Sequence, residues 1–400
     1  MHNVRKVSDN IFWLGSSDRR LAHFENVYCT PCGMSYNNYI ILDEKTCLMD
    51  GIDDSVSRQF LENLNFCLNG RTLDYMVVNH MEPDHCSVIP ELIKEHPDMK
   101  IVATESAFKM MKQFYDLDTD SFAVKVKEND TLELGEHTLS FIMAPMVHWP
   151  EVMVAYESKT STLFSADAFG AFGAMSGNIF SDETDWEREF SDEARRYYAN
   201  IIGKYGTQVS ALMKKLDAKS ISTICPLHAH IWRKNPGIII DKYKKWMTYT
   251  PEKRSVCIYY GSVYNNTANA ADILAVKLAE KGVRNVRVFD VTKTDKSELL
   301  ARAFEYSHLI FAAATYNANI FDNMEVLLTD LKNHNMSNRT VGIMENGSWA
   351  ITAGSLIRKK LDELKNITVL EPSVKILSAV KEDSLQQIEA LSEAIVSSLK

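Results

Sequence analysis

The chain from Arg254 onward alternates short apolar runs with longer amphipathic segments, and this pattern constrains the fold more than any other feature. The runs at 255–260, 286–291, 309–314, 341–344 and 369–376 are typical of buried strands, and the segments at 268–281, 297–306, 324–333, 351–364 and 385–399 are typical of helices. Because parallel strands are joined by crossover helices, the alternation predicts an α/β fold with a doubly wound parallel sheet.

The part of the chain before this pattern is long enough to form a domain of its own. A chain of 400 residues is long for one hydrophobic core and suits two. Polar residues at 248–253 resemble a short linker, so we expect domains at 1–250 and 251–400.

Composition excludes some classes of function. A net charge of −9 argues against nucleic-acid binding, which needs a basic surface. The first residues are not followed by an apolar signal segment, and no apolar run reaches the length of a membrane span. We therefore expect a cytoplasmic protein that binds neither nucleic acid nor membrane.

The cysteines indicate reduced thiols. There are 7, at irregular spacing, which does not suit a disulfide framework. Cys29 and Cys32 have the spacing of a redox motif, but the second such pair that an iron or structural zinc site would need is missing. We therefore favour ordinary thiols over a redox or metal role.

Three loops follow the first, third and fourth expected strands of the parallel sheet, where ligands of such sheets bind. The first is rich in hydroxyl and amide side chains and precedes a helix, so its N–H groups suit a phosphate, although such loops are also plain helix caps. The candidate ligand-binding residues are Ser262, Val263, Tyr264, Asn265, Asn266, Thr267, Ala314, Thr315, Tyr316, Asn317, Asn346, Gly347, Ser348, Trp349 and Ala350.

In the first domain, the run from His80 to His85 (HMEPDH) places metal-binding side chains directly after an apolar segment. A single histidine or aspartate there would be an ordinary turn residue. His80 and His85 together with Glu82 and Asp84 instead predict a metal site, and the mixture of imidazoles and carboxylates without thiolates suits iron or manganese as well as zinc.

Other metal-binding residues follow apolar runs further along the chain: His148, Asp167 and His228. Each would be weak evidence alone, because an isolated histidine is more often structural. With the HMEPDH run, however, they make seven donors, which is too many for one tetrahedral ion and suits two metals that share a carboxylate. We expect Asp167 to be the shared residue.

These residues, in this order, resemble the metallo-β-lactamase-like domain of flavodiiron proteins. The hydrolytic zinc members of that superfamily have a histidine at the position of Glu82, and a carboxylate there favours iron. The segments at 24–25, 35–37 and 196–200 also resemble the family. The family usually has serine before and glycine after the last ligand, whereas Leu227 and Ala229 flank His228 here, which leaves the role of His230 open.

The three loops of the second domain resemble flavodoxin, in which FMN lies between them. The resemblance implies that the first loop binds the phosphate and that Tyr316 and Trp349 lie beside the flavin ring. The whole chain thus resembles a flavodiiron protein: a metallo-β-lactamase-like αββα sandwich followed by a flavodoxin-like sheet.

The resemblance implies a function and a set of ligands. It implies an oxidoreductase that reduces dioxygen to water, nitric oxide to nitrous oxide, or both, with two iron ions and FMN as cofactors. His80, Glu82 and His148 would bind one iron, and the other iron would be bound by Asp84, His85 and His228. Electrons would come from a separate donor such as rubredoxin, and the chain would form a head-to-tail homodimer or a tetramer built from it.

Two other functions remain open at this point. One is a zinc-dependent hydrolase with a regulatory flavodoxin domain, although Glu82 argues against it. The other is an electron carrier or sensor whose metal domain is vestigial, although the full set of candidate ligands argues against that.

Overall fold

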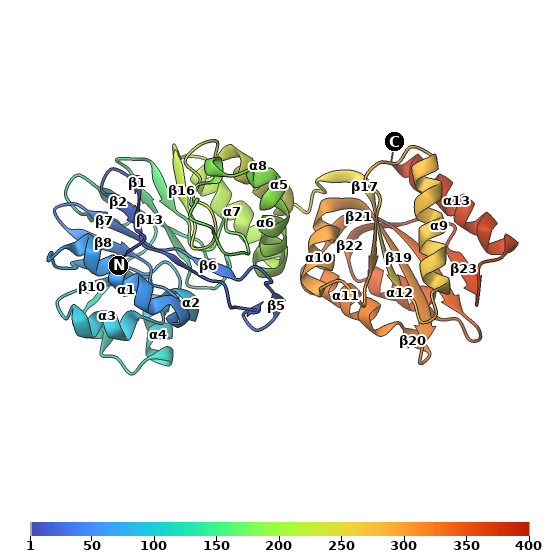
Figure 1. Ribbon diagram of the computed structural model, residues 1–400, viewed down its shortest axis with the longest axis horizontal. Coiled ribbons are helices and arrows are strands. Elements are labelled where there is room, and N and C mark those ends of the chain that lie inside the picture. Colours follow the sequence, from blue (N-terminus) through green and yellow to red (C-terminus); the bar gives the residue numbers. More distant parts are fainter. Residues whose placement is uncertain (1, 400) are drawn as a thin grey trace. The chain divides into compact units, whose positions relative to one another are not determined.

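The computed structural model describes residues 2–399, which form two compact units (Figure 1). The first unit runs to Tyr198 and resumes over Thr207–Lys244. The second contains Ala199–Gly206 and the chain from Lys245 onward, so the polar residues at 248–253 belong to it. No helix in the described part of the chain is long and apolar enough to cross a membrane.

Two mixed sheets form the centre of the first unit. The strands of the first sheet are, in order, β1 (Arg5–Ser8), β2 (Ile11–Trp13), β7 (Tyr39–Leu42), β8 (Thr46–Met49), β9 (Tyr75–Val77), β10 (Lys100–Ala103) and β11 (Ala123–Lys125). Those of the second are β12 (Thr131–Glu133), β13 (Thr138–Met143), β14 (Met153–Glu157), β15 (Thr162–Phe164) and β16 (Thr223–Cys225). One buried core joins the sheets, with Tyr39 and Met49 from the first and Phe141 and Phe164 from the second.

Helices lie outside the two sheets of this unit (Figure 1). They are α1 (Ser57–Leu68), α2 (Pro83–Cys86), α3 (Ile89–Glu95), α4 (Glu105–Phe114), α5 (Trp186–Glu189), α6 (Ser191–Tyr197), α7 (Gly206–Leu216) and α8 (Gly237–Trp246). Two short hairpins complete the unit: β3 (Ser16–Asp18) pairs with β6 (Met34–Tyr36), and β4 (His23–Phe24) pairs with β5 (Tyr28–Cys29). The expected αββα sandwich is confirmed.

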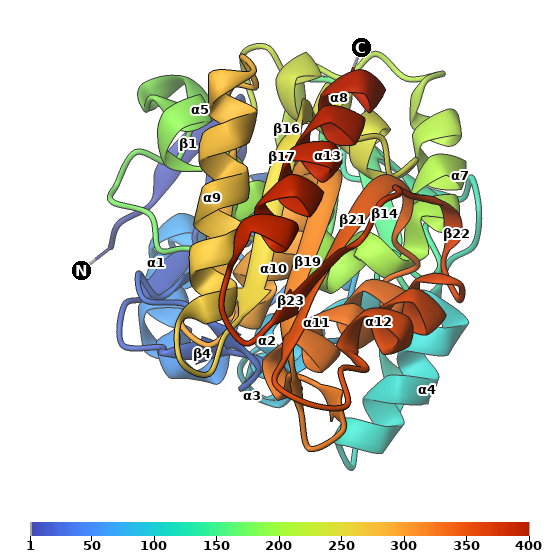
Figure 2. The same ribbon diagram turned by 90° about the vertical axis from the view of Figure 1, so that its right-hand side faces the viewer.

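The second unit is a parallel sheet between two layers of helices (Figure 2). Its strands are, in order, β18 (Arg287–Asp290), β17 (Lys253–Gly261), β19 (Tyr306–Tyr316), β21 (Ser337–Gly347) and β22 (Lys365–Val369). Helices α9 (Asn266–Glu280) and α13 (Glu382–Ser398) pack together, as do α10 (Lys296–Glu305), α11 (Asp322–Asn333) and α12 (Ala353–Leu361). This strand order is that of a flavodoxin-like fold, so the predicted doubly wound sheet is confirmed.

The prediction of one continuous strand at 369–376 was wrong. The structure has two short strands there, β22 and β23 (Val374–Leu377), and both pair with β21. Pro372 lies between them. Because proline has no N–H to donate to a neighbouring strand, the ladder breaks at this point. A short strand β20 (Asn319–Ile320), which the sequence pattern did not indicate, folds back on the end of β19.

Candidate metal centre and flavin site

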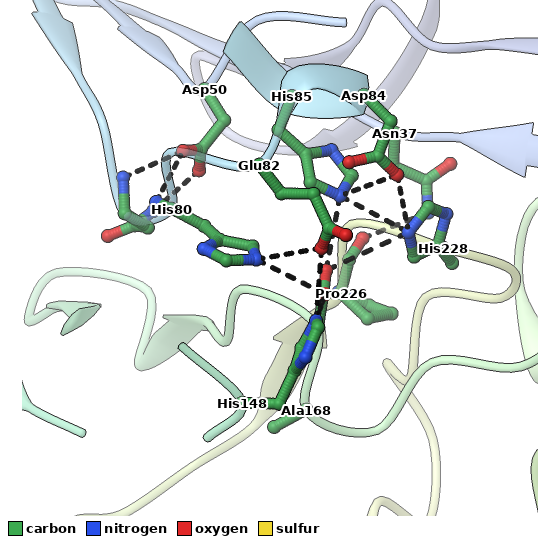
Figure 3. A network of polar contacts seen from close by, with 12 residues as sticks. Asn37, Asp50, His80, Glu82, Asp84, His85, His148, Ala168, Pro226 and His228 are labelled. Atoms are coloured by element: carbon green, nitrogen blue, oxygen red, sulfur yellow. Dashed lines mark hydrogen bonds and ion pairs between the residues drawn. The ribbon is translucent and has the colours of Figure 1, made fainter. Parts of the chain in front are cut away.

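The structure brings the seven candidate metal ligands together. All of them except Asp167 are labelled in Figure 3. His80 and Glu82 lie in the loop after β9, Asp84 and His85 lie on α2, and the other three follow β13, β15 and β16. They form two groups. The first contains His80, Glu82, His148 and Asp167, and the second contains Asp84, His85 and His228. All are buried except His148, which is half-buried.

Glu82 is the centre of the first group. Its Oε2 lies 3.0 Å from Nε2 of His80 and 3.0 Å from Nε2 of His148. Asp167 approaches the same group, with its Oδ2 3.1 Å from Nε2 of His148 and 3.7 Å from Nε2 of His80. Two imidazole nitrogens and two carboxylate oxygens therefore face one point.

In the second group, Nε2 of His85 and Nε2 of His228 are 3.2 Å apart, and each lies 3.3 Å from Oδ2 of Asp84. The other oxygen of Asp167, Oδ1, lies 3.1 Å from Nε2 of His85. Asp167 thus presents one oxygen to each group, which is the arrangement of a bridging carboxylate.

Three features of this geometry fit two metal ions. Bonds of about 2.0 to 2.2 Å place neighbouring ligand atoms roughly 2.9 to 3.6 Å apart, close to the separations found here. Two neutral histidines whose Nε2 atoms are 3.2 Å apart do not stabilise each other unless a cation or a proton lies between them. Within the described residues, Oδ1 of Asp84 is buried without a hydrogen-bond partner, and Oδ2 of Asp84 and Oδ1 of Asp167 face only imidazole nitrogens. Buried charges of this kind are paired or coordinate metals.

The carboxylates also make the site strongly negative. Burial lowers the pKa of His148, but hydrogen bonds to Asp167 and Glu82 outweigh it and raise the pKa to about 9. Burial likewise lowers the pKa of His85, whereas the charges of Asp84 and Asp167 raise it to about 9. A site that favours protonated imidazoles to this extent favours any cation, metal ions included.

Unusual backbone conformations hold two of the ligands in place. Ala166, directly before Asp167, has φ +49°, and Ala229, directly after His228, has φ +58°. Such conformations are rare for residues with a Cβ and concentrate at functional sites. Gly170 allows the two loops to meet, because a Cβ there would lie 3.2 Å from the Asp167 carbonyl oxygen and 3.3 Å from Cβ of His228.

Residues 35–37, which resemble the family, support the loop that carries His228. The Nδ1–H of His228 donates to the Ser35 carbonyl oxygen at 2.7 Å, and the Ala229 N–H donates to Ser35 Oγ at 2.9 Å. The side-chain amide of Asn37 donates to the carbonyl oxygens of Pro226 and Ala229, at 2.9 and 2.8 Å. This loop is therefore held by side chains far away in the sequence.

Sequence reasoning missed two further carboxylates beside the ligands. Asp50 is buried and accepts hydrogen bonds from the backbone and side chain of Asn79, both at 2.7 Å, next to His80 (Figure 3). Burial raises its pKa to about 6, although the Asn79 hydrogen bond opposes the shift. Glu151 contacts His80 directly. Asp50 directly follows β8, so its position at the end of a strand is a signal that could have found it, whereas no local pattern marks Glu151.

The residues left open by the sequence lie outside the metal groups. His230 is buried, with its ring 4.3 Å from that of Phe190, and burial lowers its pKa to about 4. Cys29 is half-buried, Cys32 is exposed, and neither forms a disulfide. These observations agree with structural roles.

A cavity of about 370 Å³ opens onto Glu82 and Asp84. Phe24, Tyr36 and Pro83 line part of it, and Glu25 lines another part. Burial and the nearby charge of Glu82 raise the pKa of Glu25 to about 8. The cavity gives a small molecule a route to both metal groups.

In the second unit, the three candidate segments lie at the carboxyl ends of β17, β19 and β21, which are neighbours in the sheet. The strands run further than expected, so Ala314, Thr315 and Tyr316 are the last residues of β19, and Asn346 and Gly347 are the last of β21. They enclose a cavity of about 290 Å³. Its lining consists of Ser262, Val263, Tyr264, Asn266, Thr267, Ala314, Thr315, Tyr316, Asn346, Gly347, Ser348, Trp349 and Ser378. Ser378, which follows β23, was not expected, because β23 reaches this edge only through the fold.

The remaining three candidates of this site lie at its border. Asn317 and Ala350 line an adjoining cavity of about 220 Å³ together with Trp349. Asn265 is the N-cap residue of α9, has φ +64°, and lines neither cavity.

The chemistry of this cavity fits FMN. Ser262 Oγ and Asn346 Oδ1 are buried without a hydrogen-bond partner among the described residues, and both belong to the lining. The N-terminus of α9 begins at the first loop, which is where a phosphate binds. Tyr264 is 87% exposed and Trp349 is 81% exposed, so large aromatic faces stand open at the cavity. An aromatic ligand would cover them.

Comparisons with known proteins relate the chain to one family. The family model described as ODP family beta lactamase matches residues 34–229. The anaerobic nitric oxide reductase flavorubredoxin of Escherichia coli (strain SMS-3-5 / SECEC) is 32% identical over 362 residues, which cover 89% of this chain and 75% of that protein.

Solved structures show the same architecture over the whole chain. The rubredoxin oxygen:oxidoreductase of Desulfovibrio gigas is 25% identical, with a TM-score of 0.90 over 99% of this chain and 98% of that one. The flavodiiron protein of Giardia intestinalis has a TM-score of 0.92 over 99% and 97%, and at 22% identity it supports the fold alone. With the sequence relationship to flavorubredoxin, these findings show that the chain belongs to the flavodiiron protein family.

Proposed function

We propose that this oxidoreductase reduces dioxygen to water, nitric oxide to nitrous oxide, or both, at two irons in the first unit, with electrons that arrive through FMN in the second. The observation that carries the proposal is the position of Asp167, whose two oxygens face two separate groups of ligands. The relatives are named for these two reactions, one as a nitric oxide reductase and one as an oxygen oxidoreductase. Neither relative is named as a hydrolase, so the zinc hydrolase alternative is not favoured.

The ligand assignment follows the two groups. We propose that His80, Glu82 and His148 hold one iron, that Asp84, His85 and His228 hold the other, and that Asp167 bridges them. When bound, two irons would supply electrons to the gas, and FMN would pass electrons to them one at a time. Zinc could not replace iron in this role, because it does not change its oxidation state. The aromatic and apolar side of the cavity above Glu82 and Asp84 suits small uncharged gases.

The flavin assignment follows the second cavity. We propose that Ser262, Thr267 and the N-terminus of α9 bind the phosphate of FMN. The flavin ring would lie beside Tyr316 and Trp349, which line the same cavity. The 1–250 segment would then be the diiron domain and the 251–400 segment the FMN domain, except that Ala199–Gly206 and residues 245–250 belong to the second compact unit.

The partners are part of the proposal. The names of the relatives from E. coli and D. gigas both contain rubredoxin, so we propose a separate rubredoxin-like donor in the cytoplasm. Electron transfer requires the flavin and the irons to lie close together. A head-to-tail homodimer, or a tetramer built from it, would place each flavin beside the metal centre of a second chain, because an isologous contact serves both pairs at once.

Metal and flavin analysis followed by gas mixing would test the function. Purified protein should contain two irons and one FMN per chain. The reduced protein, mixed anaerobically with either gas, should be reoxidised while it consumes that gas. Zinc in place of iron, or reduced protein that reacts with neither gas, would contradict the proposal.

A further inference from the structure

Glu151 lies beside the first metal group without belonging to it. Its side chain is fully buried, with a relative exposure of 0%. One oxygen, Oε1, accepts a hydrogen bond from Nδ1–H of His80 at 2.8 Å and another from the Met81 N–H at 2.9 Å. The carboxylate therefore contacts the side of the His80 ring that faces away from Glu82 and Asp167.

The histidines of the second group are held differently. Nδ1 of His228 donates to a neutral backbone carbonyl, that of Ser35. Nδ1 of His85 is buried and has no hydrogen-bond partner among residues 2–399. His80 thus differs from both in having an anionic partner.

Glu151 also joins the two loops that carry the histidines of the first group. It follows His148 by three residues, so the His148 loop is tied by its side chain to His80 and Met81. Its backbone oxygen accepts a hydrogen bond from Thr104 at 3.2 Å, and the Met153 N–H donates to the Asn79 carbonyl at 3.1 Å. The Glu151 side chain is therefore a second tie between the two loops, beside the backbone bond from Met153 to Asn79, and it is the one that reaches the His80 ring.

This contact decides which nitrogen of His80 is available to a metal. With the proton on Nδ1 directed at Glu151, the lone pair of Nε2 is left for a cation, and Glu82 Oε2 and Asp167 Oδ2 lie 3.0 and 3.7 Å from this nitrogen, so all three atoms can bind the same ion. Carboxylates in this position fix the tautomer and the orientation of ligand histidines and make them better donors.

We propose that Glu151 is a positioning residue of the metal centre, which sets the tautomer of His80 and the place of the His148 loop, and so controls metal affinity at the first group. This inference rests on the proposed diiron function. It assigns no step of the reaction to Glu151.

Two substitutions separate the components of this role. Glu151→Gln keeps the volume and one acceptor oxygen and removes the charge. Glu151→Leu also removes the acceptor. Neither tautomer of His80 is then favoured by a hydrogen bond at Nδ1, and the Met81 N–H loses its partner. The expected order of metal affinity at the first group is wild type, then Gln, then Leu.

The chain contains a matched control. Glu157 at the far end of β14 is also fully buried beside a histidine, with Oε1 3.2 Å from Nδ1 of His137. It lies six residues from Glu151, and the extended residues of β14 alone separate the two by about 13 Å. Glu157→Gln and Glu157→Leu therefore remove a buried carboxylate from the same sheet away from the metal ligands.

The test is a titration of the metal-free, full-length protein with Fe²⁺ under anaerobic conditions, in competition with a chromophoric chelator. Wild type should bind two irons. Glu151→Leu should weaken one of them by about 10- to 100-fold, the range measured for such partners, and Glu151→Gln should weaken it less. Co²⁺ bound to the same variants should show an altered visible spectrum for one ion, and the Glu157 variants should match wild type in both measurements.

Wild-type affinity for both irons in Glu151→Leu would overturn the proposal, as would an equal loss in Glu157→Leu. If Glu151→Leu does not fold, the test rests on Glu151→Gln, because glutamine preserves the packing. Unchanged iron affinity and an unchanged Co²⁺ spectrum in Glu151→Gln would then overturn the proposal. Failure of the proposed function would look different: the wild type itself would bind fewer than two irons, and the role of Glu151 would fall with it.

Discussion

Replacing Ser262 and Thr267 with alanine should weaken FMN binding through the phosphate. Ser262 Oγ is buried and has no partner among the described residues, so it is free to donate to a ligand. Thr267 Oγ1 accepts a hydrogen bond from Asn346 Nδ2 at 3.2 Å, which leaves its own hydrogen available. Both side chains line the cavity at the start of α9.

The magnitude follows from the charge of the phosphate. A hydrogen bond to a charged oxygen contributes about 1.5 to 3 kcal/mol. Two such bonds, if additive, contribute about 3 to 6 kcal/mol, which corresponds to roughly two to four decades in Kd. The double variant should therefore lose most of its FMN during purification.

The assay is titration of flavin-free protein with FMN, followed by flavin fluorescence, in parallel with riboflavin, which has no phosphate. FMN affinity should fall as stated, and riboflavin affinity should change little. Thr329→Ala with Ser355→Ala is the control, because both hydroxyls donate to carbonyl oxygens of residues close to them in the chain, Glu325 and Thr352. Unchanged FMN affinity, or an equal loss for riboflavin, would refute the assignment of the first loop to the phosphate.

Three other predictions concern the metal centre, assembly and pH. Asp167→Ala should lose iron from both groups, because one oxygen faces each; metal analysis that still finds two irons in an active variant would disprove the bridge. A metal-deficient chain (Asp84→Asn with His228→Ala) and the flavin-site double variant should recover reductase activity after subunit exchange, whereas no recovery despite proven exchange would mean that electrons pass within one chain. Burial lowers the pKa of His308 to about 4 from a usual 6.5, so the folded state binds fewer protons than the unfolded state between these values, and stability should fall as the pH drops from about 6.5 to 4. Urea unfolding of wild type and His308→Gln across this range should show a smaller loss in the variant; equal losses would count against His308 as the source.

Local sequence patterns were sufficient for most of the second unit and for choosing the seven residues that the structure brings together in two groups. Apolar runs and amphipathic segments alternate there in the order of the strands and helices, because the central strands β17, β19 and β21 are largely buried and the helices bury one face. The candidate ligands could be selected because each follows a strand, where a rigid element ends and a side chain is held in place. The single strand expected at 369–376 is the exception: Glu371, Pro372 and Ser373 interrupt the apolar run, and the hydrogen-bond ladder breaks at the same place.

Tertiary structure decided what surrounds those ligands. The division into two groups, the separate directions of the two oxygens of Asp167, and the contacts from Glu151 and Ser35 to ligand histidines all join residues far apart in the chain. The same holds for Ser378 in the flavin cavity. A sequence pattern reports which side chains share a local element, but it does not report which distant loops the packing of two sheets brings within hydrogen-bond distance. For this protein the sequence by itself determined the kind of chemistry, and only the fold decided how each ligand is held.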